Sequence, residues 1–259
     1  MSKFSILTAC YNSGKFLKDW GESILQQVYR PLEVVLAIDI YKKDTDRELT
    51  RSLVKEFYEV FAENKIEFKV IESKTRLYCA NCYELARYNA TGIYFGILDS
   101  DDMLMKGAVE EVVSMYDKYP DVAYIYTQYK PCDSRMKKIK GAVGVSSHPG
   151  KYKTLLNTVI NGRHGFSHWR TFSSRIKRPD KIFKPGLKCV VDKNMGFRLE
   201  EQGIGMFYDK PLYRYRGRTM YSVSTSNPTR LVVKDIIADA LWRRKNYHLK
   251  IKPILYLKP

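Results

Sequence analysis

Residues 93–102 read IYFGILDSDD, an apolar run that ends in three carboxylates within four positions. The apolar part is typical of a buried strand, and Asp99, Asp101 and Asp102 follow at its end. Carboxylates this close together repel one another and resist burial, so a positive partner is expected beside them. An Asp-x-Asp at a strand end suits Mg²⁺ or Mn²⁺, which take carboxylate, water and phosphate oxygens as ligands. An acidic loop that caps the helix starting near Lys106 is the alternative.

Strand-like and helix-like stretches alternate on both sides of this run. Strands are predicted at 4–9, 31–39, 67–73, 93–99 and 121–130, and helices at 15–27, 49–65 and 79–91. Nearly continuous apolar strands joined by helices predict an α/β fold, with a mostly parallel sheet flanked by helices. Ligands of such sheets bind beyond the carboxyl ends of the strands, so Thr8, Tyr11, Asp39 and the aspartates should meet there.

The loops after these strands exclude two common nucleotide sites. Neither G-x-G-x-x-G nor G-x-x-x-x-G-K-[ST] follows any of them, so the usual dinucleotide and P-loop phosphate cradles are missing. A nucleotide bound to this sheet would need a metal to hold its phosphates.

Composition indicates a folded protein of a reducing compartment. The 259 residues are 44% hydrophobic, which is enough for a core, and no run reaches about 18 apolar residues. The first residues lead directly into a predicted core strand, and five scattered cysteines argue against a disulfide framework. We therefore expect a cytoplasmic protein, with contact to the inner membrane face as an option.

The net charge of +17 is unevenly distributed. Residues 130–190 hold 15 basic and two acidic side chains, whereas residues 1–129 hold 16 basic and 20 acidic ones. This asymmetry favours an anionic partner, such as nucleic acid, a phosphate-bearing substrate, an acidic polysaccharide or an anionic membrane. A solvated basic surface without a partner is the alternative.

Two stretches carry a resemblance to a known family. SILTACYNSGKFLKDWGESILQQVYRPLEVVLAID (5–39) and ATGIYFGILDSDDML (90–104) resemble the nucleotide-sugar-binding half of the family 2 glycosyltransferases, which have the GT-A fold. The resemblance covers residues 3–125 and continues more loosely to 222. It implies transfer of a sugar from a nucleotide diphosphate to an acceptor hydroxyl, with inversion at the anomeric carbon. The Q-x-x-R-W signature of processive synthases is absent, which favours addition of a single sugar.

The resemblance also implies roles for individual residues. Thr8 and Tyr11 would line the base pocket, and Asp39 would accept a hydrogen bond from the base, which favours uracil and a UDP-sugar. Asp99 would meet the ribose or the metal's water shell, and Asp101 would bind Mn²⁺ or Mg²⁺ across the diphosphate. Asp99 and Asp101 are thus the predicted metal residues.

Three more residues are assigned to the nucleotide-sugar site: Arg76, His168 and Arg170. The last two belong to GRHGFSHWRTF (162–172), in the region where an acceptor or the diphosphate would lie. Further along, Tyr213 and Tyr215 alternate as strand residues do, which predicts packing positions.

The general base is expected in FKPGLKCVVDKNMGFRLEEQ (183–202), which resembles the family segment where an aspartate opens a helix. Val191 replaces the first acid of that segment, and Asp192 keeps the second. The resemblance assigns the general base to Asp192. The chemistry needs such a residue, because attack by an acceptor hydroxyl requires removal of its proton on the face opposite the leaving nucleotide. An ordinary helix cap is the other role open to this residue.

The predicted organisation is a transferase domain at 1–225 followed by a basic amphipathic helix and tail at 226–259. Within the domain, 1–129 would bind the nucleotide sugar, and 130–225 would supply the base and bind a glycan or lipid-linked acceptor. The tail could lie on an anionic membrane or dock onto its own domain. The alternative function is a non-catalytic protein that binds polyanions or nucleic acid on a degenerate transferase fold. Nucleic acid is disfavoured, because the strand-end carboxylates would repel phosphate unless a metal intervened.

Overall fold

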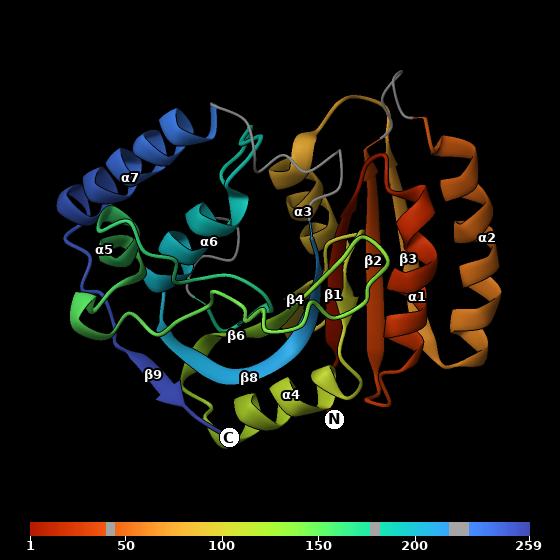
Figure 1. The fold of residues 1–259 in the computed structure, drawn as a ribbon, viewed down its shortest axis with the longest axis horizontal. Helices are drawn as coiled ribbons and strands as arrows, with labels where there is room; N and C mark the ends of the chain where they lie inside the picture. The colour runs from red at the N-terminus through yellow and green to blue at the C-terminus, as the bar shows by residue number, and fades with distance from the viewer. Residues whose placement is uncertain (40–44, 177–181, 218–227) are drawn as a thin grey trace.

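A single nine-stranded sheet runs through the molecule (Figure 1). The computed structural model describes residues 1–39, 45–176, 182–217 and 228–259. The strand order is β3-β2-β1-β4-β7-β6-β8-β5, and β9 pairs with β8. The strands are β1 (Phe4–Cys10), β2 (Leu32–Asp39), β3 (Ile66–Ser73), β4 (Tyr94–Ile97), β5 (Met103–Leu104), β6 (Val122–Cys132), β7 (Arg170–Ser173), β8 (Ile204–Arg216) and β9 (Ile254–Leu257). The predicted mixed α/β architecture is confirmed.

The first four strands are parallel, as their apolar sequences predict. β1 pairs in parallel with both β2 and β4, and β2 pairs in parallel with β3. β4 is shorter than predicted, because it ends at Ile97 and the aspartates already belong to the following turn. Mixed pairing begins at β7, which is antiparallel to both β4 and β6.

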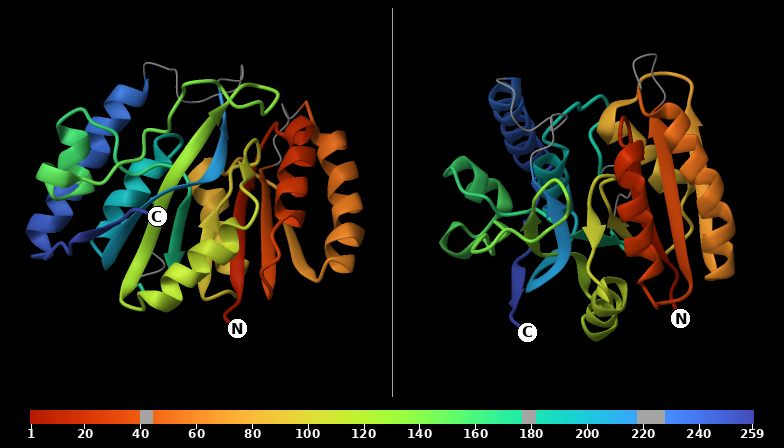
Figure 2. Two further views of the ribbon diagram at one scale, coloured as in Figure 1. Left: turned by 60° about the horizontal axis from the view of Figure 1, so that its bottom comes forward. Right: turned by 45° about the vertical axis from the view of Figure 1, so that its right-hand side comes forward.

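Helices cover both faces of the sheet. They are α1 (Leu17–Leu25), α2 (Arg47–Glu63), α3 (Tyr78–Asn89), α4 (Ala108–Lys118), α5 (Leu155–Ile160), α6 (Val191–Glu200) and α7 (Pro228–Asn246), with short 3-10 turns η1 (Gly14–Phe16) and η2 (Gly150–Tyr152). The core on one face joins the strands to α1, α2 and α4. The core on the other face joins them to α3, α5, α6 and α7. Figure 2 shows α5, α6 and α7 gathered at the end of the molecule opposite α1 and α2.

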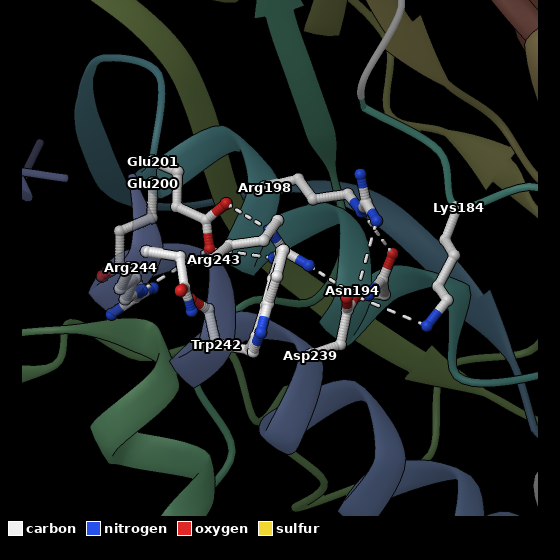
Figure 3. A network of polar contacts seen from close by, with 10 residues as sticks. Lys184, Asn194, Arg198, Glu200, Glu201, Asp239, Trp242, Arg243 and Arg244 are labelled. Atoms are coloured by element: carbon white, nitrogen blue, oxygen red, sulfur yellow. Dashed lines mark hydrogen bonds and ion pairs between the residues drawn. The ribbon is translucent and has the colours of Figure 1, made fainter. Parts of the chain in front are cut away.

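The C-terminal helix docks onto its own chain. Ile236 and Ala240 of α7 are buried in the second core. Arg243 and Arg244 of α7 reach Glu201 and Glu200 at the end of α6 (Figure 3). Of the two roles open to the tail, the structure therefore supports docking for this helix.

The segment after α7 forms an element that the sequence analysis did not predict. β9 adds to the edge of the sheet in parallel to β8, with Gly205 opposite Ile254. No helix in the described part of the chain is both long enough and apolar enough to cross a membrane.

Candidate functional site

The ends of three neighbouring strands bring the predicted donor-side residues to one edge of the sheet. In the parallel register Leu7 of β1 lies beside Ile97 of β4, and Cys10 of β1 lies beside Ile38 of β2. Tyr11, Asp39 and Asp99 follow these strand positions directly or within two residues. The predicted meeting of strand ends therefore exists in the structure.

Asp39 organises one side of this edge. Its buried carboxylate accepts hydrogen bonds from the backbone N–H groups of Leu77 at 2.9 Å and Tyr78 at 3.0 Å, at the start of α3. It also forms an ion pair with Arg76 at 3.1 Å. The Arg76 guanidinium lies 3.5 Å from the centre of the Tyr11 ring, a cation–π distance. Tyr11, Asp39 and Arg76, which were predicted separately, thus form one cluster.

Thr8 is placed differently from the prediction. Its side chain is fully buried, and its hydroxyl accepts a hydrogen bond from the Trp20 indole at 3.1 Å. Thr8 therefore fixes α1 against β1, and a direct contact of its side chain with a nucleobase does not fit this arrangement.

Asp99 is the centre of the other side of the edge. It accepts a hydrogen bond from Arg170 at 2.8 Å and another from the Tyr83 hydroxyl, and its backbone N–H lies 3.2 Å from the Tyr213 hydroxyl. Burial alone would raise the pKa of Asp99, but the charge of Arg170, with these hydrogen bonds, holds it below its ordinary value. Asp99 therefore stays a carboxylate, with Arg170 and His168 both beside it.

The other two aspartates differ in environment. Asp102 is buried, and its oxygens accept hydrogen bonds from the Tyr213 hydroxyl at 2.8 Å and from the Arg216 N–H at 2.6 Å. Burial and the charges of Asp101 and Asp99 raise the pKa of Asp102 well above its usual range. Burial and the charge of Asp99 also raise the pKa of Asp101 to about 6. Both pKa values are raised, as expected of buried carboxyl groups whose neighbours carry too little positive charge.

His168 is held by three aromatic rings. Its ring stacks on Tyr213 and Tyr215, with centroid distances of 4.8 and 5.0 Å, and meets the edge of Tyr129. Burial and the nearby Arg170 lower the pKa of His168 to about 4, so the imidazole is neutral. Its buried Nδ1 has no hydrogen-bond partner and lies 3.7 Å from Asp99 Oδ2. An unpaired nitrogen directed at a carboxylate is unusual in a protein interior.

These groups fit a divalent cation. Ligand atoms of Asp99, Asp102 and His168 all lie within 4.8 Å of one another. A divalent ion there would satisfy the orphaned Nδ1 and offset the negative charge of the crowded carboxylates. The grouping differs from the predicted pair, because it contains Asp102 and His168 and does not contain Asp101. Asp101 as a ligand therefore stays a prediction.

Arg216, at the end of β8, is a buried residue of the site. Its guanidinium bonds to Asp19 at 2.7 Å and to the backbone oxygens of Asp101 at 2.5 Å and Ser134 at 2.6 Å. It thereby fixes the turn that carries the three aspartates. The contacts join residues more than 80 positions apart, so no local pattern could have revealed them.

Asp192 lies in the first turn of α6, as predicted. The residue before the helix is Val190, which makes no side-chain cap, so Asp192 is not the helix cap that was its alternative role. It lines a small cavity of about 30 Å³ together with His164, Phe166 and Ser167. Its charge acts on both His168 and Arg170, which places it within electrostatic reach of the aspartate cluster.

Comparison with known proteins agrees with this geometry. Residues 5–179 match the sequence profile described as glycosyl transferase family 2. A chondroitin synthase of Escherichia coli is 26% identical over 222 residues, which are 86% of this chain and 29% of that protein. The glycosyltransferase GlyG of Streptococcus pneumoniae is 26% identical over 41% of this chain and 32% of its own length. The chain thus spans about a third or less of these curated relatives.

Solved structures share the fold at low sequence identity. S. aureus TarS 1–349 in complex with UDP-GlcNAc has a TM-score of 0.69 and 21% identity, over 92% of this chain and 66% of that one. The mannosyltransferase PcManGT from Pyrobaculum calidifontis, in complex with GDP-Man and Mn²⁺, has a TM-score of 0.60 and 13% identity, over 95% and 75% of the two chains. Because the family profile matches well over half of the sequence and the architecture is the GT-A fold of these transferases, the chain belongs to glycosyl transferase family 2.

Proposed function

We propose that the chain is a metal-dependent, inverting and non-processive glycosyltransferase that moves one sugar from a UDP-sugar to an acceptor hydroxyl. The observation that carries the proposal is the convergence of Tyr11, Asp39 and Asp99 at one edge of the sheet, beside the unpaired Nδ1 of His168. Such an edge is where open α/β sheets bind ligands.

The donor would lie along this edge. The Tyr11 ring and the Asp39 carboxylate would hold the base, and the TarS complex with UDP-GlcNAc supports uracil as the first base to test. Asp99, His168 and either Asp101 or Asp102 would hold a Mn²⁺ or Mg²⁺ ion, and the PcManGT complex with Mn²⁺ supports this assignment. When bound, the ion would offset the negative charge of the diphosphate leaving group.

Asp192 would act as the general base. Its carboxylate takes the proton of the acceptor hydroxyl while that oxygen bonds to the anomeric carbon, and the bond from this carbon to the phosphate oxygen breaks on the opposite face. The small cavity lined by Asp192, Phe166 and Ser167 would receive the reacting hydroxyl. This geometry inverts the configuration at the anomeric carbon.

Calorimetric titration of UDP, GDP and dTDP tests the donor site, with Mn²⁺ and with EDTA in parallel. We expect one nucleotide, UDP, to bind only with the metal, and Asp101→Ala to abolish this binding if Asp101 is a ligand. Asp121→Ala is the matched control, since it removes an exposed carboxylate just before β6. Absence of binding for every nucleotide in both conditions would contradict the transferase proposal and favour the non-catalytic polyanion binder.

The base is tested separately by Asp192→Asn. We expect kcat for UDP release in the presence of acceptor to fall by about 10²–10⁴-fold, while the Kd of UDP stays unchanged. An unchanged kcat would remove Asp192 from the mechanism without affecting the donor site.

A further inference from the structure

A basic pocket lies beside the proposed acceptor position. It has a volume of about 460 Å³ and lies between η2, α5 and the segment that follows α5. Its lining residues are Val145, Ser147, His148, Pro149, Lys151, Tyr152, Thr158, Gly162, Arg163 and His164. They include two cations and two imidazoles but no carboxylate. The volume is in the range of pockets that hold small ligands, about 300–1,000 Å³.

The two cations of this basic pocket are available to a ligand. Lys151 and Arg163 are exposed, and neither side chain has an ion pair with a described residue. Buried arginines of the chain behave differently, because Arg170 and Arg216 each bind an aspartate. Cations in a concave site that lacks carboxylates attract an anionic group of a ligand.

Hydrogen bonds and a defined turn hold the wall of the basic pocket in place. His148 donates from Nε2 to the Ile254 carbonyl at 2.7 Å and accepts at Nδ1 from the Gly150 N–H at 3.1 Å, which fixes the ring against β9. Gly162 has a φ of +70°, a conformation that glycine adopts without strain, and ends α5. The turn that it makes places Arg163 on the pocket wall.

The basic pocket adjoins the cavity of the proposed base. His164 lines both the basic pocket and the small cavity that contains Asp192. An acceptor that directs its reacting hydroxyl to Asp192 would therefore extend its next unit past His164 toward Lys151 and Arg163. The electrostatic environment then selects an acceptor whose neighbouring unit is negatively charged.

We propose that the acceptor is an anionic chain that carries phosphate or carboxylate groups, and that Lys151 and Arg163 bind one of these groups. This inference rests on the proposed transferase function, because it takes Asp192 as the point where the acceptor reacts. It also gives a role to part of the positive charge of residues 130–190.

The test measures binding of three hexamers to the full chain with UDP and Mn²⁺ present. Hexagalacturonate carries carboxylates, hexameric glycerol phosphate carries phosphates, and maltohexaose is neutral. We expect at least one anionic hexamer to bind tenfold more tightly than maltohexaose, and the hexamer that binds identifies the anion. The Lys151→Ala/Arg163→Ala double variant should weaken that binding at least tenfold.

Lys137→Ala/Lys140→Ala is the matched control. It also removes two positive charges, from exposed positions between residues 130 and 190 that do not line the basic pocket. It should change hexamer binding less than twofold. Equal losses in both double variants, equal binding of maltohexaose, or no binding of either anionic hexamer would overturn the inference.

UDP affinity in each variant separates this inference from the proposed function. If UDP binds normally but the hexamers fail these criteria, only the acceptor inference is wrong. If none of UDP, GDP and dTDP binds the unmodified chain, the transferase proposal itself fails, whatever the hexamers do.

Discussion

Removing the Arg243 side chain should destabilise the protein strongly, because this residue joins α7 to α6. Its guanidinium donates to both carboxylate oxygens of Glu201, at 2.7 and 2.9 Å, and also to Asp239 (Figure 3). The side chains of Arg243 and Glu201 are only 11% and 7% exposed. Breaking a buried pair leaves an uncompensated charge and costs about 3–5 kcal/mol.

The change to make is Arg243→Met, which keeps most of the apolar stem. Arg244 stays 3.5 Å from Glu201 and offsets part of the loss, so we expect the low end of that range, about 3 kcal/mol. For a chain of this size, that corresponds to a decrease in Tm of about 6–12 °C. Thermal and urea unfolding measure the change.

Lys245→Met is the control for this prediction. Lys245 lies on the same helix, is exposed and has no ion pair with a described residue, so its replacement should change Tm by less than about 2 °C. UDP affinity should be the same in both variants, because neither residue belongs to the donor edge, the proposed UDP site at the carboxyl ends of β1, β2 and β4. If Arg243→Met unfolds at the same temperature as Lys245→Met, the network does not hold α7 in place.

Three other changes test separate parts of the molecule. Gly96→Ala would place a methyl group 2.5 Å from the Trp169 ring, and this overpacking should lower the unfolding free energy by about 2 kcal/mol in urea titration. Arg76→Met should weaken UDP binding about fivefold through loss of its cation–π contact and ion pair. Arg87→Met, in the last turn of α3, should leave the calorimetric Kd unchanged. Burial would raise the pKa of Glu33, but hydrogen bonds from Lys69, Ser5 and Thr91 hold that pKa below its ordinary value. The stability that the ionised Glu33 carboxylate contributes is therefore complete above about pH 5 and is lost as the pH falls through the lowered pKa. In Glu33→Gln the unfolding free energy should fall less steeply with decreasing pH, and an unchanged slope would refute this.

The donor edge could be predicted because parallel strands impose it. Apolar runs that end in polar residues locate strand ends, and in a parallel sheet neighbouring strands end on the same side. Tyr11, Asp39 and Asp99 therefore met as expected, without any knowledge of their contacts. The position of Asp192 in the first turn of a helix followed from the family resemblance rather than from periodicity.

The direction of the Thr8 side chain can also be predicted from the alternation of residues along β1. Phe4, Ile6 and Thr8 alternate along β1, and the first two belong to the core beneath α1 and α2. Side chains two apart on a strand share a face, so this alternation already indicates that Thr8 points into that core. The sequence therefore contains a signal for the buried face on which Thr8 lies as well as for the end of the strand.

Other features of the site depend on contacts between distant parts of the chain. The stacking of His168 between Tyr213 and Tyr215 requires β7 and β8 to lie on either side of β6, an order that no local pattern fixes. The choice between Asp101 and Asp102 as a metal residue depends likewise on the orientation that Arg216 gives to their turn. The short strand β9 has few alternating residues and carries no signal of its own.

The continuity of the sheet limits how its two halves can move relative to each other. The strands that hold the donor edge and those that approach the acceptor side are joined through the ladders β4–β7, β6–β7 and β6–β8. A rigid-body hinge between the two halves would have to break these backbone hydrogen bonds, unlike the hinge of an enzyme whose domains meet only through a linker. Any adjustment is therefore confined to segments outside the sheet, and the strands themselves set the separation between the proposed donor and acceptor sites.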